Sequence, residues 1–134
     1  MKYLLDASAI YPLALKLGEK FLDHADRFVI LDLTIYEVGN ALWKEYRLGK
    51  IKNLDVVAQL FEMIFENVKM LRIELTFHEI LNLAMKENLT FYDASYLHMA
   101  RRYGMKLVTE DADLLKFEEA INVRTLLSEL GSTS

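Results

Sequence analysis

The chain has 134 residues and no cysteine, so it is long enough to bury one core, and disulfides and thiolate metal sites are excluded. Hydrophobic residues make up 53% of it, but no stretch approaches the roughly twenty uncharged apolar residues of a membrane helix. The formal net charge of −4 argues weakly against a nucleic-acid partner, and we expect a cytoplasmic protein. Any bound metal would be held mainly by oxygen atoms, which favours Mg²⁺ or Mn²⁺.

Short apolar runs at residues 2–5 and 28–31 predict two strands in the first part of the chain. The helix after the first strand should end at Gly18, and a second short helix should span residues 19–25. A long helix should begin at Thr34 and end near Gly49, because its apolar positions recur at helical spacing. The same periodicity predicts a helix over residues 53–68.

The remaining segments predict strands at residues 68–73, 106–109 and 121–124. Helices are expected at residues 78–88, 90–103, 112–116 and 125–130. This alternation indicates the α/β class, a three-layer α/β/α sandwich around a mostly parallel sheet. We expect residues 1–130 to form one domain, and residues 131–134 to be a disordered tail or an engineered remnant. In such a fold, ligands bind beyond the carboxyl ends of the strands, where the strand order reverses.

Four acidic residues are predicted to lie at this edge of the sheet. Asp6 ends the first strand, and Glu37 lies in the first turn of the helix after the second strand. Asp93 lies in the first turn of the helix over 90–103, and Asp111 follows the strand over 106–109. Clustered carboxylates repel one another unless a cation lies among them, so their joint placement favours a metal site.

Each acid also has a purely structural explanation. The TIYE segment at residues 34–37 fits a capping box, and TFYD at residues 90–93 has the same spacing. Asp6 and Asp111 fit the starts of helices, where the helix dipole favours negative charge. Taken one at a time, the four acids are therefore more typical of helix caps than of catalytic groups.

The segments that carry these acids resemble, in order, the acidic motifs of PIN domains: LLDAS at 4–8, TIYE at 34–37, FYDASYLHMA at 91–100 and LVTEDADL at 107–114. The similarity is closest to the VapC toxins of prokaryotic toxin–antitoxin pairs and covers essentially the whole chain. It implies a metal-dependent endoribonuclease that hydrolyses RNA phosphodiester bonds with Mg²⁺ or Mn²⁺. It also implies a small VapB-like antitoxin as partner and a homodimer.

Carried over residue by residue, the resemblance implies that the catalytic and metal-binding acids are Asp6, Glu37, Asp93 and Asp111. Ser8 and Thr109 match hydroxyl positions that support this cluster, and Asn40 would face the site one turn after Glu37. Asp113 is an extra ligand or the cap of the short helix behind it, and we favour the cap. RNA contacts are assigned to Lys44, Arg47, Arg101 and Arg102, although a solvated helix face explains these four equally well.

Two alternatives remain open. In the first, the acids are caps, and the chain is a non-catalytic PIN-like interaction module. In the second, the chain is a PIN nuclease of RNA processing that has no antitoxin. Among the aromatic residues, Tyr96 is expected to pack in the core, whereas Tyr36 and Trp43 are expected to serve an interface.

Overall fold

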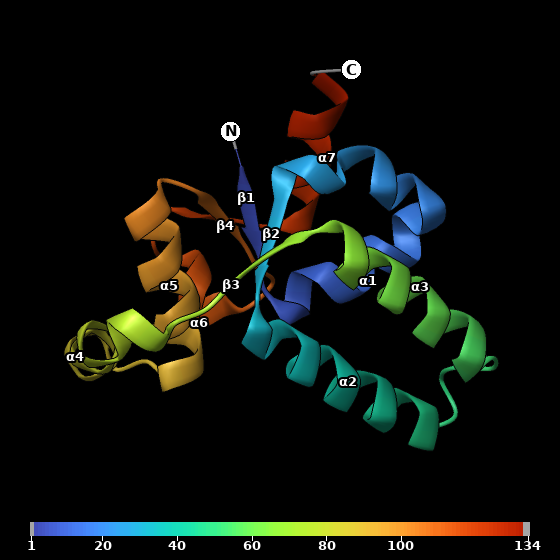
Figure 1. Cartoon of the computed structure of the whole chain (residues 1–134), viewed down its shortest axis with the longest axis horizontal. Helices are drawn as coiled ribbons and strands as arrows, with labels where there is room; N and C mark the ends of the chain where they lie inside the picture. Colours follow the sequence, from blue (N-terminus) through green and yellow to red (C-terminus); the bar gives the residue numbers. More distant parts are fainter. Residues whose placement is uncertain (1, 133–134) are drawn as a thin grey trace.

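The computed structural model describes residues 2–132 and has a parallel sheet at its centre (Figure 1). The strand order is β3-β2-β1-β4-β5, and every neighbouring pair is parallel. The strands are β1 (Tyr3–Leu5), β2 (Phe28–Leu31), β3 (Lys69–Leu71), β4 (Lys106–Val108) and β5 (Ala120–Ile121). The chain builds outward from β1 to β3 and then returns to place β4 on the other side of β1. The strand order therefore reverses between β1 and β4.

Helices cover both faces of this sheet. One face carries α1 (Ala7–Leu17), the 3₁₀ segment η1 (Gly18–Arg27), α2 (Asp32–Arg47), α3 (Leu54–Asn67) and α7 (Val123–Ser132). The other carries α5 (Phe91–Tyr103) and α6 (Ala112–Leu115), with α4 (Phe77–Glu87) packed outside α5 after the 3₁₀ turn η2 (Glu74–Thr76). This arrangement confirms the three-layer α/β/α sandwich.

The buried strand residues alternate between the two layers of helices. Leu5 and Phe28 face the α1 side, whereas Leu4 and Val29 face the α5 side. All four residues of β2 are buried, as a strand covered on both faces requires. Within residues 2–132, no helix is both long enough and apolar enough to cross a membrane.

Several predicted elements have other bounds, or another helix type, in the structure. The helix expected to begin at Thr34 begins at Asp32, and the residues expected as a short α-helix at 19–25 form a 3₁₀ segment. The last strand, expected at 121–124, ends at Ile121, because the Asn122 side chain accepts a hydrogen bond from Thr125 N–H at 2.8 Å and starts α7. Helix α7 continues to Ser132, and residues 133–134 lie outside the described part of the chain.

Candidate active site

The carboxyl ends of β1 and β4 meet at the point where the strand order reverses. Asp6 directly follows β1, and its backbone N–H donates to the Val108 carbonyl at the end of β4, at 3.2 Å. Asp111 follows β4 by three residues and begins α6 as its N-cap. Adjacent strands therefore bring two of the predicted acids to the same edge of the sheet.

Asp6 is held by several donors and is almost completely buried, at 5% exposure. As the N-cap of α1, its Oδ1 accepts from Ala9 N–H at 3.0 Å, and the same atom accepts from Ser8 Oγ at 2.7 Å. Burial raises the pKa of Asp6 to about 6, although hydrogen bonds from Thr109, Ser8 and Ala9 act in the opposite direction. The negative charge of Glu37 raises this pKa further, so a cation at this position would relieve an unfavourable charge.

The hydroxyls of Ser8 and Thr109 join the two loops that carry Asp6 and Asp111. The two hydroxyl oxygens lie 3.3 Å apart, and Ser8 Oγ also accepts from Glu110 N–H at 2.9 Å. Thr109 Oγ1 accepts from Asp111 N–H at 3.0 Å. Both hydroxyls therefore lie between Asp6 and the loop that carries Asp111. Glu110 is turned away from the site, because its Oε1 accepts from the first backbone N–H of α7 at 2.8 Å.

Glu37 lies in the second turn of α2 and is positioned by a tyrosine from α5. The Tyr96 hydroxyl donates to Glu37 Oε1 at 2.6 Å and lies 2.8 Å from Thr34 Oγ1. Thr34 Oγ1 in turn accepts from Leu31 N–H at 3.1 Å, and because Tyr96 donates to Glu37, the Thr34 hydroxyl donates to Tyr96. Burial raises the pKa of Glu37, and the Tyr96 hydrogen bond partly counteracts this.

The capping box expected at residues 34–37 does not exist. Thr34 is the third residue of α2 rather than its cap, and its hydroxyl reaches back to Leu31. The Glu37 carboxylate is therefore free of any capping role. The related pattern at residues 90–93 is partly confirmed, because Thr90 caps α5 by accepting from Asp93 N–H at 3.1 Å.

Asp93, Asp111 and Asp113 form the most compact acidic group in the described part of the chain. Each offers a carboxylate oxygen that lies within 4.8 Å of those of the other two. Burial raises the pKa of Asp93 to about 6, and the charges of Asp111, Glu37 and Asp113 add to this effect. All donors here are carboxylate oxygens, the set that suits Mg²⁺ or Mn²⁺. The geometry therefore fits a divalent cation.

The preference for Asp113 as a cap is wrong. Asp111 caps α6, since its Oδ1 accepts from Asp113 N–H at 2.8 Å, and Asp113 lies inside the first turn. The sequence offered Asp at both positions, and only the backbone geometry distinguishes the cap from the residue that follows it. The side chain of Asp113 is exposed and belongs to the acidic group.

The residues predicted to contact RNA do not lie beside the four acids. Arg101 and Arg102 lie in the last turn of α5, at the opposite end from Asp93, and Arg101 Nε donates to Glu119 at 2.7 Å. Lys44 and Arg47 are exposed on the last turn of α2, where Arg47 lies 4.9 Å from the centre of the Trp43 ring system. Asn40 is likewise exposed, one turn after Glu37.

Tyr96 is the site residue that the sequence analysis missed. Its ring packs in the core as predicted, at 1% exposure, but its hydroxyl reaches Glu37. Burial raises its pKa above the usual value for tyrosine, with the nearby Glu37 charge adding to the effect, so the hydroxyl remains protonated. The only signal in the sequence was a polar atom on an otherwise apolar helix face, and buried tyrosine hydroxyls generally need a partner.

Comparison with known proteins finds one matching family model and two similar proteins. Residues 3–120 match the family model described as the PIN domain. The chain is 43% identical over 133 residues to Exonuclease VapC9 of Pyrobaculum aerophilum, and 98% of each chain is covered. It is 36% identical over 123 residues to Ribonuclease VapC3 of the same organism, with 85% of this chain and 92% of the relative covered.

Two solved structures have the same fold. The crystal structure of PAE2754 from Pyrobaculum aerophilum matches with a TM-score of 0.88 and 42% identity, over 98% of this chain and 90% of that chain. A toxin–antitoxin complex from Klebsiella pneumoniae matches with a TM-score of 0.62 and 17% identity, over 90% of this chain and 96% of that chain. At this identity, the second likeness shows the fold alone.

Proposed function

Since the chain belongs to the PIN-domain family, we propose that it is a metal-dependent endoribonuclease and the toxin of a toxin–antitoxin pair. The observation that carries the proposal is the convergence of Asp6, Glu37, Asp93 and Asp111 on one edge of the sheet. Two of these acids, Asp6 and Asp93, have a pKa of about 6 in the metal-free protein. The proposal treats residues 1–130 as one nuclease domain.

The cation would be Mg²⁺ or Mn²⁺. The nearest candidate ligands are the oxygens of Asp93 and Asp111, with Asp113 as an additional one and Asp6 completing the site from the end of β1. When bound, such an ion activates water for attack on a phosphodiester and stabilises the negative charge that develops on the leaving oxygen. It would also offset the repulsion between this acidic site and an anionic substrate, which answers the objection raised by the net charge.

The chain's own residues orient the groups around that ion. Ser8 donates to Asp6 Oδ1, and Thr109, which lies 3.3 Å from the Ser8 hydroxyl, holds the loop that presents Asp111 by accepting from its backbone N–H. Tyr96 takes up Glu37 Oε1, so Glu37 Oε2 remains to accept a hydrogen bond from a water or to contact the ion. The Asp6 and Glu37 carboxylates are thus held in place before substrate binds, which lowers the cost of reaching a productive geometry.

The proposal also includes two partners. Exposed apolar side chains on the second half of α2 and just after it, namely Trp43, Tyr46 and Leu48, support a helix surface that a second copy of the chain or a VapB-like antitoxin covers. Lys44 and Arg47 lie on the same stretch and remain candidates for RNA contact. Arg101 is a weaker candidate, because its guanidinium is already paired with Glu119.

The test uses the chain purified without a partner and incubated with linear and circular RNA in Mg²⁺, Mn²⁺ or EDTA. Asp6→Asn and Asp93→Asn remove a charge, and asparagine still caps α1 as well as aspartate does. Asp55→Asn, in the first turn of α3, is the matched control, because it is an exposed acid at a helix start outside the site. We expect metal-dependent cleavage of both RNAs by the wild type and Asp55→Asn, and none by the two site variants.

Each other outcome has a definite meaning. Cleavage of linear but not circular RNA would replace the endonuclease proposal with exonuclease activity. Cleavage that survives EDTA or both site substitutions would refute the metal-dependent mechanism.

The non-catalytic interaction module remains a second candidate, because Asp6 and Asp111 do cap helices. It would be favoured if the wild type neither cut RNA nor bound Mn²⁺. A nuclease of RNA processing would be favoured if cleavage occurred but no gene for a small DNA-binding protein lay beside that of this chain.

A further inference from the structure

A hollow walled by aromatic side chains lies beside the acidic site. It has a volume of about 240 Å³, and the starts of α2 and α5 form its two sides. Three aromatic residues line it, namely Tyr36, Phe91 and Tyr92. Leu33 and Ile73 add aliphatic side chains, and Asp32 and Ser95 add polar ones. Tyr36 and Tyr92 directly precede Glu37 and Asp93 in the chain, so this hollow lies within a few ångströms of the backbone that carries two of the acids.

The rings of this hollow differ in how they are held. Phe91 is supported by Phe77, with ring centroids 5.2 Å apart. Tyr36 is 77% exposed and Tyr92 is 58% exposed, and neither ring stacks on another aromatic ring within residues 2–132. The lining of the hollow therefore includes one ring that packs against another ring, and two exposed rings that stack on no aromatic ring of the described residues.

We propose that this hollow binds one nucleobase of single-stranded RNA, adjacent to the phosphodiester that is cut. Unstacked bases in RNA are commonly held by stacking on aromatic side chains. The volume is below the roughly 300–1,000 Å³ of pockets for drug-sized ligands, so it suits a single base rather than a larger group. This inference rests on the proposed nuclease activity, because the divalent cation that the neighbouring acids would hold is what would bind the phosphate.

Asp32 gives the hollow a preference among bases. Its Oδ1 accepts from Leu33 N–H at 3.0 Å, while Oδ2 has no hydrogen-bond partner among the described residues. A carboxylate oxygen accepts from an exocyclic amino group, as aspartate does with the cytosine N4 amino group. Cytosine, adenine and guanine carry such a group and uracil does not. The hollow therefore favours an amino-bearing base over uracil.

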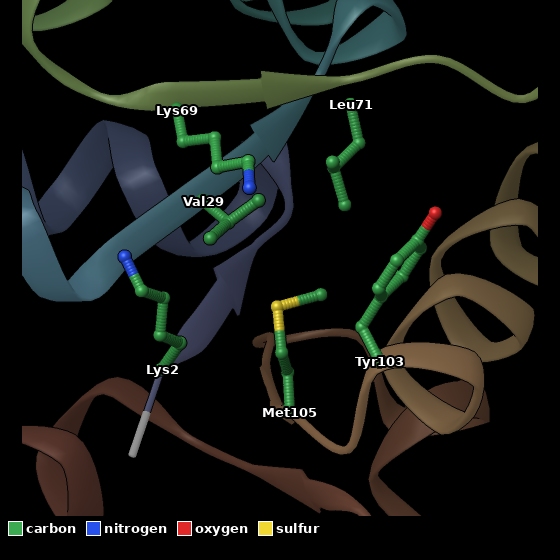
Figure 2. Close-up of a pocket in the computed structure, with 6 residues that line it drawn as sticks. All are labelled: Lys2, Val29, Lys69, Leu71, Tyr103 and Met105. Carbon is green, nitrogen blue, oxygen red and sulfur yellow. The ribbon is translucent and has the colours of Figure 1, made fainter.

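A second pocket, at the opposite end of α5, provides the contrast (Figure 2). The Lys2 and Lys69 side chains lie on one side of it and the Tyr103 ring on the other. The Lys2 ammonium group already donates to the Asp26 carbonyl at 2.8 Å, and no acid of the candidate active site lines this pocket. Tyr103 is 54% exposed, and about 16 Å of helix separates it from Tyr92. It is therefore a matched control for Tyr92.

The first experiment compares kinetics on oligonucleotides that differ in one base at the cut site, cytosine or uracil. Tyr36→Ala and Tyr92→Ala should raise KM for the cytosine oligonucleotide about 5- to 150-fold, the range expected for one lost stacking contact. The value of kcat and the Mn²⁺ affinity should stay within about twofold of the wild type. Tyr92→Phe should keep the low KM, because it keeps the ring. Tyr103→Ala should change nothing.

Asp32→Asn tests the base preference separately. Its amide both donates and accepts, so the preference for cytosine over uracil in kcat/KM should fall at least about fivefold, while the Mn²⁺ affinity is unchanged. An unchanged preference would refute the role of Asp32. If Tyr36→Ala and Tyr92→Ala altered KM no more than Tyr103→Ala does, the base-binding proposal would be overturned.

A titration that needs no cleavage separates this inference from the nuclease proposal. Cytidine and uridine monophosphates are added to ¹⁵N-labelled protein, and the amide signals of Leu33 and Ser95 are followed. Cytidine monophosphate should shift these signals at lower concentration than uridine monophosphate, even if the wild type cuts none of the RNAs offered. If neither nucleotide shifts them, and Tyr36→Ala instead weakens self-association in sedimentation, the hollow is a contact between copies, and the inference is wrong.

Discussion

Replacing Tyr96 with phenylalanine removes one oxygen atom from the middle of the candidate site and leaves the packed ring in place. In the wild type, that hydroxyl donates to Glu37 at 2.6 Å and accepts from Thr34, and the residue is 1% exposed. The substitution removes the hydrogen-bond donor of the partly buried Glu37 carboxylate. It also leaves the buried Thr34 hydroxyl without its acceptor, where water cannot easily replace it.

The size of the effect follows from these contacts. A hydrogen bond to a charged group contributes about 1.5–3 kcal/mol to stability. For a chain of 134 residues, the entropy of unfolding of about 2.1 cal/mol/K per residue converts this to a fall in Tm of about 5–11 °C. Because the Tyr96 hydrogen bond lowers the pKa of Glu37, its loss should raise that pKa. Mn²⁺ affinity should therefore fall more at pH 6 than at pH 8, since protons compete for the carboxylate.

The assay is calorimetric titration of Mn²⁺ at both pH values, together with thermal unfolding. Tyr3→Phe is the matched control, because Tyr3 is also buried and donates to a glutamate, Glu129, at 2.7 Å, at the opposite end of the sheet. Tyr3→Phe should lower Tm without changing Mn²⁺ affinity. If Tyr96→Phe left Mn²⁺ affinity unchanged at both pH values, the positioning role of Tyr96 would be refuted.

Other expectations concern the acids and the hydroxyl that supports them. The pKa of Asp6 is about 6 in the folded protein and 3.8 in an unperturbed carboxyl, so the folded state binds more protons between these values. In the metal-free protein, Asp6 alone should therefore contribute a loss of about 3 kcal/mol of stability as the pH rises from about 4 to 7, and Mn²⁺ should restore stability in urea denaturation at pH 7. Asp93→Asn removes a charge that faces Asp111, so it should raise the Tm of the metal-free protein while weakening Mn²⁺ binding at least about tenfold in calorimetry. Thr34→Val should cost about 1–3 kcal/mol in the same denaturation assay, because it leaves the Leu31 N–H unpaired, whereas Thr34→Ser should cost less.

Much of the fold follows from local patterns in the sequence. The apolar run at 28–31 is β2 with the predicted bounds, and the helices expected to end at Gly18 and at residue 103 do so, before glycines with φ of 56° and 63°. These signals are strong because continuous burial and positive φ each restrict the choice of residue. The resemblance to PIN domains is confirmed by the family match over residues 3–120.

The wrong predictions fall where one local sequence pattern is compatible with two structures, and only contacts with residues distant in the sequence decide between them. The TIYE segment has the spacing of a capping box, but Thr34 instead bonds to Leu31 and to Tyr96, which is distant in the sequence. Helical periodicity likewise predicted that Tyr96 packs in the core. Periodicity indicates the side to which a ring points, but it does not indicate the hydrogen-bond partner of the ring's hydroxyl. The carboxylates of Asp6 and Asp111 combine capping with a place in the cluster, so the two explanations considered for them are compatible.

The central position of β1 has a consequence for when the protein acquires its site during synthesis. Tyr3 pairs with Phe28 on one side and with Lys106 on the other, so β1 lacks one neighbour until the last quarter of the chain has emerged from the ribosome. A nascent chain therefore carries Asp6 and Glu37 long before Asp111 can join them, and pairings this distant in sequence form late. We expect a chain still attached to the ribosome to be unable to cut the RNA that surrounds it.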